Sequence, residues 1–351
     1  MPSKKVKLFL GAFVNQTNAQ NINCRELAKE INNNDFQIYT LKIRHGDTNV
    51  ILPKHVKTFT CIYPVKITGF LGYLWGFYHS DIVYLPRADF LKWQMILIKV
   101  FKRKSIKTIE NVIDDESLNS ALSVPNRKLN DIVEYYTYCD KNHPITRFVG
   151  EQNLRNFHIP FDEPILPVPT DTEFFNKYFR VRRKLKSIAF IGNDFRRKGL
   201  TDFIKLANEF PDLEFLVIGR GNFDLFKEEL KNKNCKYLGP LNHQELVREM
   251  NVADLHFFPS KSEGFGKVTI ECAAMGIPSI VYDSYGAKEW INQGEGFVVN
   301  SFKEVIHVIE NLKEGRSSIA EISRATKLLA ERFSTKNIAR IYERVFLNLY
   351  E

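Results

Sequence analysis

The stretch that most constrains the fold runs from Phe257 to Ile291 and reads FFPSKSEGFGKVTIECAAMGIPSIVYDSYGAKEWI. Its apolar start predicts a strand, and a glycine-bracketed turn, Gly264–Gly266, follows. Val268–Met275 is then predicted as a helix, because the glycine and proline that come next are typical C-terminal signals. The apolar residues 279–282 predict a second strand. A strand that enters a helix through a glycine turn directs backbone N–H groups at the helix N-terminus to one point, where they attract phosphate.

Two carboxylates make this stretch specific. The spacing places Glu263 at the N-terminal mouth of the helix and Glu271 about two turns along it. An isolated pair with this spacing is typical of a cap and a solvated helix residue. The surrounding sequence PSKSEGFGKVTIECAAMGIPSIV, however, resembles the signature of family 4 glycosyltransferases, PS-x-x-EGFG-x-x-x-x-E-A-x-A-x-G-x-P. It departs at Cys272, where that family usually has Ala, and at Lys267, where an apolar residue is usual.

The resemblance implies retaining enzymes of the GT-B fold that use nucleotide sugars. That fold is α/β, with two Rossmann-like domains whose parallel sheets face an interdomain cleft. A chain of 351 residues is too long for one core and fits two domains. The proline-rich segment Ile165–Phe175 predicts the boundary, since prolines disfavour helix and central strand. We therefore expect an acceptor-binding domain over 1–165, a nucleotide-sugar-binding domain over 166–335, and a final helix over 336–351 that crosses back to the first domain.

Composition narrows the class of protein. Apolar residues make up 44%, as in a folded chain, and five scattered cysteines without CxxC spacing argue against a disulfide framework or a zinc site. The N-terminus reads as a first strand and not a signal peptide, and no apolar run reaches the roughly 18 residues of a membrane span. The net charge is +9, and residues 1–170 carry 22 Lys and Arg against 16 Asp and Glu. This excess favours an anionic partner, and without a nucleic-acid module a membrane surface is the better candidate.

Two segments of the first half could touch that surface. Ile67–Tyr78, ITGFLGYLWGFY, is rich in aromatic residues; its length and position favour a core helix over a membrane element. Asp89–Lys104, DFLKWQMILIKVFKRK, has an apolar face and a basic C-terminal end. Such a helix can lie on an anionic bilayer or pack on a sheet with its cations at the helix C-terminus, and both alternatives stay open.

The first half begins as a βαβ unit, with strands predicted at Val6–Phe13 and Phe36–Ile43. It lacks G-x-G-x-x-G, so no dinucleotide fingerprint is present. By the resemblance, Gly11 approaches the donor sugar while Asn15 and Gln16 face the acceptor. The strand predicted from Ser105 to Ile113 passes the acceptor-side candidates Glu110 and Asn111, where relatives often have a His. Asp114 and Asp115 beyond it form no D-x-D motif; we interpret them as a solvated loop and expect no metal.

The second half opens with a strand predicted at Ser187–Gly192, followed by the turn NDFRRKG and a helix over 200–210. Alone, the cations Arg197 and Lys198 could form an ordinary solvated turn. In the resembling family an Arg and a Lys at this turn bind the donor diphosphate, and two cations at a helix N-terminus are suited to neutralise a leaving phosphate. The same resemblance implies that the strand ends at Gly219, Arg220 and Leu241 approach the nucleobase, which agrees with ligand binding at the carboxyl ends of parallel strands.

The resemblance implies transfer of a sugar, with retention, from a nucleotide diphosphate-sugar to a hydroxyl acceptor. A UDP-sugar is the expected donor and no cofactor is needed. The acceptor is expected to be a glycan or a lipid-linked glycan of cell-envelope polysaccharide or lipopolysaccharide synthesis, made in the cytoplasm at the inner face of the membrane. The alternatives are a catalytically silent GT-B assembly partner and a nucleotide-sugar epimerase, whose acid/base set is not evident.

The same resemblance assigns roles to the motif residues. Glu271 binds the ribose, Glu263 holds sugar hydroxyls, and Arg197 and Lys198 stabilise charge on the departing phosphate. Further donor contacts come from the glycine turn, and two residues after the last strand line the sugar side. These residues are Gly264, Phe265, Gly266 and Lys267 in the turn, and Gly286 and Glu289 after the strand.

Overall fold

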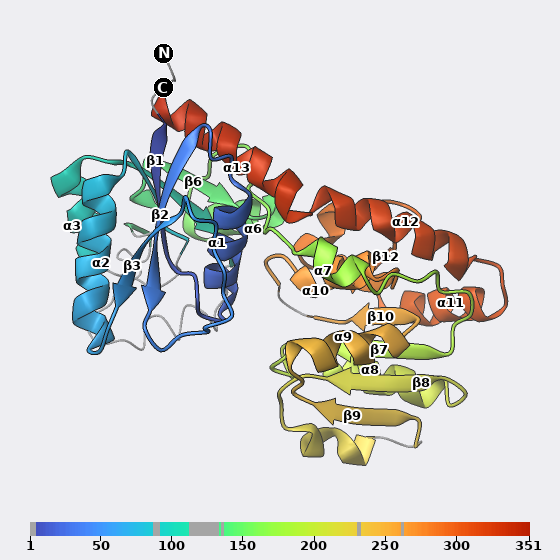
Figure 1. The fold of residues 1–351 in the computed structure, drawn as a ribbon. Helices are drawn as coiled ribbons and strands as arrows, with labels where there is room; N and C mark the ends of the chain where they lie inside the picture. Colours follow the sequence, from blue (N-terminus) through green and yellow to red (C-terminus); the bar gives the residue numbers. More distant parts are fainter. Residues whose placement is uncertain (1–4, 87–91, 112–132, 135–136, 230–232, 261–262) are drawn as a thin grey trace. The chain divides into compact units, whose positions relative to one another are not determined.

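The structure is a computed structural model that describes residues 5–86, 92–111, 133–134, 137–229, 233–260 and 263–351 (Figure 1). It divides into two compact units, Met1–Pro169 with Thr335–Glu351, and Thr170–Ser334. Each unit contains one six-stranded sheet whose strand pairs are all parallel. The prediction of two α/β domains with parallel sheets is confirmed. The predicted cleft between the sheets stays a prediction.

The sheet of the first unit has the order β3-β2-β1-β4-β5-β6. Its inner strands are apolar on both faces, as expected for a parallel sheet covered on both sides. β1 and β2 have the predicted bounds, whereas β3 and β6 were not predicted. The strands are β1 Val6–Phe13, β2 Phe36–Ile43, β3 Lys57–Cys61, β4 Ile82–Tyr84, β5 Lys104–Ile109 and β6 Lys141–Pro144.

Helices cover this first sheet. α1 (Ala19–Glu30) packs beside α13 (Thr335–Tyr350), whose aromatic side chains contact Phe36 and Tyr84 in the strands. Residues of α2 and α3 join the core cluster around alternate side chains of β1, such as Phe9. The last helix of the chain therefore completes the core of the first unit. The other bounds are α2 Val65–His79, α3 Lys92–Phe101 and α6 Arg147–Phe157.

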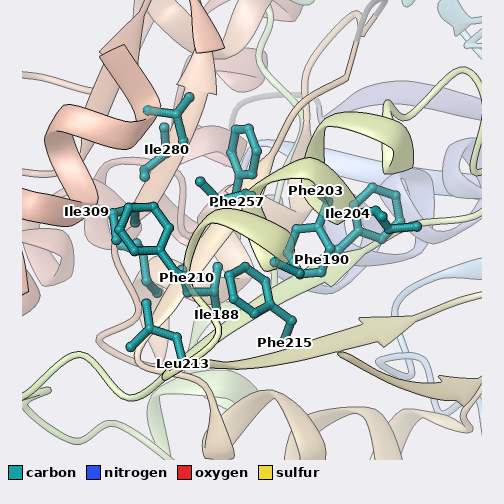
Figure 2. Close-up of a cluster of buried hydrophobic side chains, with 14 of the residues drawn as sticks. Ile188, Phe190, Phe203, Ile204, Phe210, Leu213, Phe215, Phe257, Ile280 and Ile309 are labelled. Atoms are coloured by element: carbon teal, nitrogen blue, oxygen red, sulfur yellow. The ribbon is translucent and has the colours of Figure 1, made fainter. Parts of the chain in front are cut away.

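The sheet of the second unit has the order β12-β11-β10-β7-β8-β9. Figure 2 shows the core on one side of it, where Phe203 of α8 (Leu200–Glu209) meets phenylalanines of the central strands. Phe203, Phe215 and Phe257 are fully buried there, and burial of such side chains stabilises the fold by about 1.5–3 kcal/mol each. The strands are β7 Ser187–Ile191, β8 Glu214–Ile218, β9 Cys235–Gly239, β10 Leu255–Phe258, β11 Ser279–Tyr282 and β12 Phe297–Val299.

The order of these strands positions the candidate site. β10 pairs with β7 and β7 pairs with β8, so the turns that leave their carboxyl ends are neighbours at one edge of the sheet (Figure 1). In the described part of the chain, no helix is both long and apolar enough to span a bilayer. The helices are α7 Thr172–Asn176, α8 Leu200–Glu209, η1 Phe223–Glu229, α9 His243–Val252, α10 Lys267–Ala274, η2 Gly286–Glu289, α11 Phe302–Lys313 and α12 Ile319–Arg332.

Candidate functional site

The turn after β7 carries two cations into the site. The Asp194 carbonyl accepts from the Lys198 N–H, and Asp194 Oδ2 accepts from Arg197 Nε at 3.1 Å. Gly199 then adopts φ +78°, and a Cβ at this position would lie 2.0 Å from the carbonyl oxygen of Pro259. Glycine thus permits the β7–α8 turn to press directly against the turn that leaves β10.

This close approach brings Glu263 to both cations. Arg197 Nη1 lies 3.0 Å from Glu263 Oε1, and Lys198 Nζ contacts the same oxygen. Ser260 Oγ also donates to Oε1, at 3.5 Å. The side chains of Lys198 and Glu263 are each only 14% exposed, so water screens this ion pair weakly. The sequence predicted that these residues share a site, but not that they pair with each other.

Lys198 occupies an unfavourable place for a positive charge. Burial lowers its pKa to about 7; the charge of Arg197 lowers the pKa as well, and Asp194 acts in the opposite direction. The contact with Glu263 also favours the charged form. Lys198 Nζ lies 4.8 Å from the centroid of the Phe258 ring, which offers it a further weak attraction. An additional anion close to Lys198 would therefore restore its proton.

His256 is a site neighbour that sequence reasoning missed. It is fully buried in β10, and its Nδ1 lies 3.0 Å from Ser279 Oγ. Burial, with Lys198 adding to the effect, lowers the pKa of His256 to about 3, so the ring is neutral at physiological pH. Only its place in the apolar strand that precedes Pro259 and Ser260 could have indicated this position.

α10 begins immediately beyond the cations. Its N-cap is Gly266, in the left-handed region at φ +75°, which has no side chain of its own to cap the helix. The first N–H groups of a helix lack intrahelical partners and carry partial positive charge. α10 starts at Lys267, one residue before the predicted start, and Gly264 to Gly266 are buried. Phe265 anchors the turn by packing on Trp290 at 4.3 Å between ring centroids.

Glu271 lies one turn after Lys267 in α10 and is partly exposed. Burial of its carboxyl raises its pKa, and the nearby Lys267 acts in the opposite direction. Beyond β11, Tyr285 donates to the Phe258 carbonyl at 3.0 Å, and the N–H of Gly286 donates to the Glu263 carbonyl at 3.5 Å. These bonds join η2, with the predicted residue Glu289, to the Glu263 turn.

The end of β8 lies against the end of β7. Gly219 adopts φ +136°, and a Cβ there would lie 2.0 Å from the Gly192 carbonyl oxygen. Arg220 is exposed, and its N–H donates to Asn193 Oδ1 at 2.7 Å. Leu241 is partly buried in the segment after β9. Gly239 ends β9, and its carbonyl accepts from the Gly219 N–H. The structure therefore joins the turns after β7 and β8, and β8 to β9.

The site residues predicted in the first unit have structural partners. Gly11 is buried within β1, and its carbonyl accepts from Tyr73 at 2.7 Å. Asn15 is buried and pairs with both the N–H and the carbonyl of Ile43. These bonds explain both residues by the fold, and their predicted contacts with donor or acceptor stay predictions. Gln16, by contrast, lines a cavity beside α2.

The acceptor-side candidates at the end of β5 lie immediately after the strand. Glu110 is partly exposed and accepts from Thr108 Oγ1 at 3.4 Å, while the Asn111 carbonyl accepts from Asn153 at 2.9 Å. Asp114 and Asp115 lie outside the described residues. Within the described ranges, no three His, Cys, Asp or Glu side chains are placed to hold a metal ion.

Comparison with known proteins finds a family whose sequence pattern matches part of this chain. Residues 171–328 match the family described as glycosyl transferases group 1. The match covers most of the second unit, including the β7–α8 turn and the Glu263 turn. The resemblance predicted from the glycine turn and its two glutamates is thereby confirmed.

Solved structures extend the likeness to both units. A glycosyltransferase from Rickettsia africae has a TM-score of 0.75 at 17% identity, over 99% of each chain. Anabaena HepE, in complex with UDP and glucose, has a TM-score of 0.73 at 14% identity, over 98% of this chain and all of that one. At such identities the likeness concerns the fold, and the chain has the GT-B fold.

A GDP-mannose-dependent monoacylated alpha-(1-6)-phosphatidylinositol monomannoside mannosyltransferase from Corynebacterium glutamicum is 31% identical. The match covers 29% of this chain and 31% of that protein. Across the first three curated relatives, the chain spans between 31% and 50% of their length.

Proposed function

We propose that this protein is a retaining glycosyltransferase that moves a sugar from a nucleotide diphosphate-sugar to a hydroxyl acceptor. The observation that carries the proposal is the contact of Arg197 and Lys198 with Glu263 beside the N-terminus of α10. When the bond from the anomeric carbon to the diphosphate breaks, the electron pair leaves with the phosphate oxygen. Two cations and a helix N-terminus held near that oxygen stabilise the new charge without reorganisation.

The two carboxylates then have different roles. The ion pairs of Glu263 use Oε1, and we assign Oε2 to a hydroxyl of the donor sugar. Glu271, in the first turns of α10, is assigned to the ribose hydroxyls, as an acceptor of hydrogen bonds. Arg220 and Leu241, at the ends of β8 and β9, are assigned to the nucleobase side. A UDP-sugar is the proposed donor, supported by the UDP and glucose bound in the structurally similar HepE.

We further propose that the cations act in place of a bound metal. Arg197 and Lys198 supply the positive charge that a divalent ion would otherwise bring to a diphosphate. Transfer should then continue unchanged in excess EDTA. A loss of activity that added Mg²⁺ or Mn²⁺ restores would contradict this part of the proposal.

The proposed acceptor is a glycan or lipid-linked glycan, modified in the cytoplasm at the inner face of the cell membrane. Two names among the relatives support an envelope acceptor: a phosphatidylinositol mannoside in one and O-antigen biosynthesis in another. The positive net charge of residues 1–170 supports contact with an anionic membrane.

Titration calorimetry with UDP, GDP and their sugar conjugates tests donor binding, and transfer of a labelled sugar to an envelope extract tests the reaction. Lys198→Ala should lower transfer on the order of 10²–10³-fold, the usual cost of losing one contact to a transition-state charge. Lys205→Ala, an exposed lysine on α8, is the matched control and should be active. Absence of nucleotide binding would favour a silent assembly partner, and an isomerised free nucleotide sugar would favour an epimerase.

A further inference from the structure

α2 has its apolar residues distributed in an unusual way. Three glycines face the sheet: a Cβ on Gly76 would lie 2.4 Å from Phe9, one on Gly72 2.9 Å from Leu41, and one on Gly69 3.4 Å from the Phe13 ring. The helix can therefore lie close to the strands. Large apolar side chains stand on the opposite side. A helix that is apolar all round is normally buried, so this outward face requires a partner.

The outward face is continuous along the helix. Ile67 is 62% exposed, Leu71 48% and Tyr78 68%, and their spacing of four and seven residues places them on one side. α3 packs beside α2, because Trp93 meets the rings of Phe70 and Tyr73. α3 then adds two exposed apolar side chains. We call this set the α2–α3 surface: Ile67, Phe70, Leu71, Tyr78, Ile96 and Val100.

The charged side chains within α2 and α3 themselves all have one sign. Neither α2 nor α3 contains an aspartate or a glutamate. Lys66 and Lys99 are exposed on the two helices, and Lys102 and Lys104 are exposed immediately beyond α3. Tyr63 and Tyr78 are exposed at the two ends of α2, and tyrosine is enriched where apolar and aqueous phases meet.

We infer that the α2–α3 surface docks on a lipid bilayer whose headgroups are anionic. Apolar side chains enter the boundary of the acyl region while the lysines contact the phosphates, as in interfacial helices. A second copy of the chain fits less well, since a symmetric contact through this surface would bring two sets of lysines together. The inference rests on the membrane location proposed above and identifies the part of the molecule that makes the contact.

A cavity of about 550 Å³ adjoins the same helix. It is lined by Phe13, Val65, Phe70 and Trp93, with Gln16 at the carboxyl end of β1. This volume lies within the usual range of small-molecule sites. Phe70 belongs to both the cavity and the α2–α3 surface. The cavity thus connects the docking surface with Gln16, a residue predicted on the acceptor side, and suits the apolar part of a lipid-linked acceptor.

Vesicle flotation tests the docking. The full chain should float with vesicles that contain about 30 mol% phosphatidylglycerol and much less with pure phosphatidylcholine, and added salt should weaken binding. The double variant Ile67→Ser/Leu71→Ser should lower the partition coefficient about tenfold or more, from the loss of two partly buried apolar side chains. In the second unit, the side chains of Leu225 and Leu328 are 73% and 59% exposed. The control variant Leu225→Ser/Leu328→Ser should therefore bind vesicles as the wild type does.

Tryptophan fluorescence gives an independent readout of orientation. Brominated acyl chains should quench the wild type through Trp75 and Trp93, which lie on α2 and α3. Trp75→Phe/Trp93→Phe leaves Trp290 of the second unit and should abolish the quenching. Equal flotation of the Ile67/Leu71 variant and the wild type, or quenching that persists in the Trp75/Trp93 variant, would overturn the inference. The inference would also be overturned if the wild type formed a dimer and did not bind vesicles, and if the Ile67/Leu71 variant were a monomer.

Donor binding separates this result from the proposed function. The α2–α3 surface lies in the first unit, whereas the ion-paired residues Arg197, Lys198 and Glu263 lie in the second. Both double-serine variants should bind nucleotide sugar with wild-type affinity and unfold at the wild-type temperature. Loss of flotation in the Ile67/Leu71 variant with intact donor binding supports membrane docking. If neither the wild type nor any variant binds nucleotide, the proposed transferase function is contradicted, but the proposed docking is not.

Discussion

Protonation of Lys198 offers the sharpest test of the donor site. Burial is the main reason why its pKa is lowered to about 7; Arg197 adds to the effect and Asp194 opposes it. A diphosphate bound beside this ammonium brings negative charge that raises the pKa again. Donor binding and proton binding are therefore coupled, and each strengthens the other.

The size of the pH effect on donor affinity follows from the two protonation states of Lys198. If bound donor keeps Lys198 charged, about half of the unbound protein must take up a proton at pH 7 and nearly all of it at pH 9. Affinity should then be roughly fiftyfold weaker at pH 9 than at pH 7, a loss of about 2 kcal/mol. The sign is fixed by the raised pKa in the complex: binding strengthens as the pH falls and levels off below pH 7.

Titration calorimetry between about pH 6.5 and 9, in two buffers of different ionisation enthalpy, measures both the affinity and the protons taken up. The ligand should be a nucleotide sugar and not UDP, because a terminal phosphate itself titrates near pH 6. His256 does not interfere, since its pKa of about 3 keeps it neutral throughout.

Two substitutions separate charge from titration. Lys198→Arg keeps a positive charge that never titrates, so its donor affinity should be flat over this range. Lys198→Met removes the charge and should bind weakly at every pH. Wild-type affinity that does not change between pH 7 and 9, or an equal slope in Lys198→Arg, would refute the coupling.

Three further predictions concern the architecture of the second unit. Gly199→Ala places a methyl 2.0 Å from a carbonyl oxygen, so it should lower both the transfer rate and the stability to urea. The control Gly315→Ala has a similar positive φ in open space and should lower the free energy of unfolding by about 1–2 kcal/mol, clearly less than Gly199→Ala. Glu271→Gln should weaken donor binding about tenfold in calorimetry with unchanged urea stability, since it removes a charged acceptor. Arg332→Ala removes two 2.6 Å bonds from a partly exposed arginine to the buried Glu295 and should cost about 1–3 kcal/mol in urea unfolding. Burial raises the pKa of Glu295, but its bonds to Arg332 lower the pKa overall. The ion pair therefore stabilises the fold above about pH 4–5. The stability cost of Arg332→Ala should shrink as the pH falls through the pKa of Glu295 in the folded state.

The sequence predicted β1 and β2 well because apolar residues recur along both segments and are interrupted only by single polar residues such as Lys7 and Gln37. β1 and β2 have the expected bounds, and α10 differs by one residue at each end. β3 and β6 were missed because Lys57–Cys61 holds only two apolar residues, Phe59 and Cys61, and Lys141–Pro144 contains a proline beside a lysine, an asparagine and a histidine. Pairing with a neighbouring strand, and not local pattern, makes these segments strands.

α2 shows a different limit of prediction from sequence. The segment was predicted as a core helix, which is right for the glycine side and wrong for the side of Ile67 and Leu71. A helix with apolar residues on every side carries no periodic signal that distinguishes its faces. The spacing of Gly69, Gly72 and Gly76 was the available indication, because small residues let a helix approach a sheet closely. Which neighbours fill that space is decided only by the tertiary fold.

The donor site shows why motif residues were easier to name than to connect. Glu263 and Lys198 are 65 positions apart, and they meet because Gly199 allows one turn to contact the next. That contact has an energetic reason beyond the motif. Two adjacent cations in a poorly solvated turn repel each other, and carboxylates on either side, Asp194 and Glu263, offset the repulsion before any donor arrives. The same carboxylates weaken the net field on a diphosphate, so the N-terminus of α10 and the proton taken up by Lys198 must supply the remaining attraction. A site built in this way is stable without its ligand, and protonation of Lys198 becomes complete when the diphosphate binds.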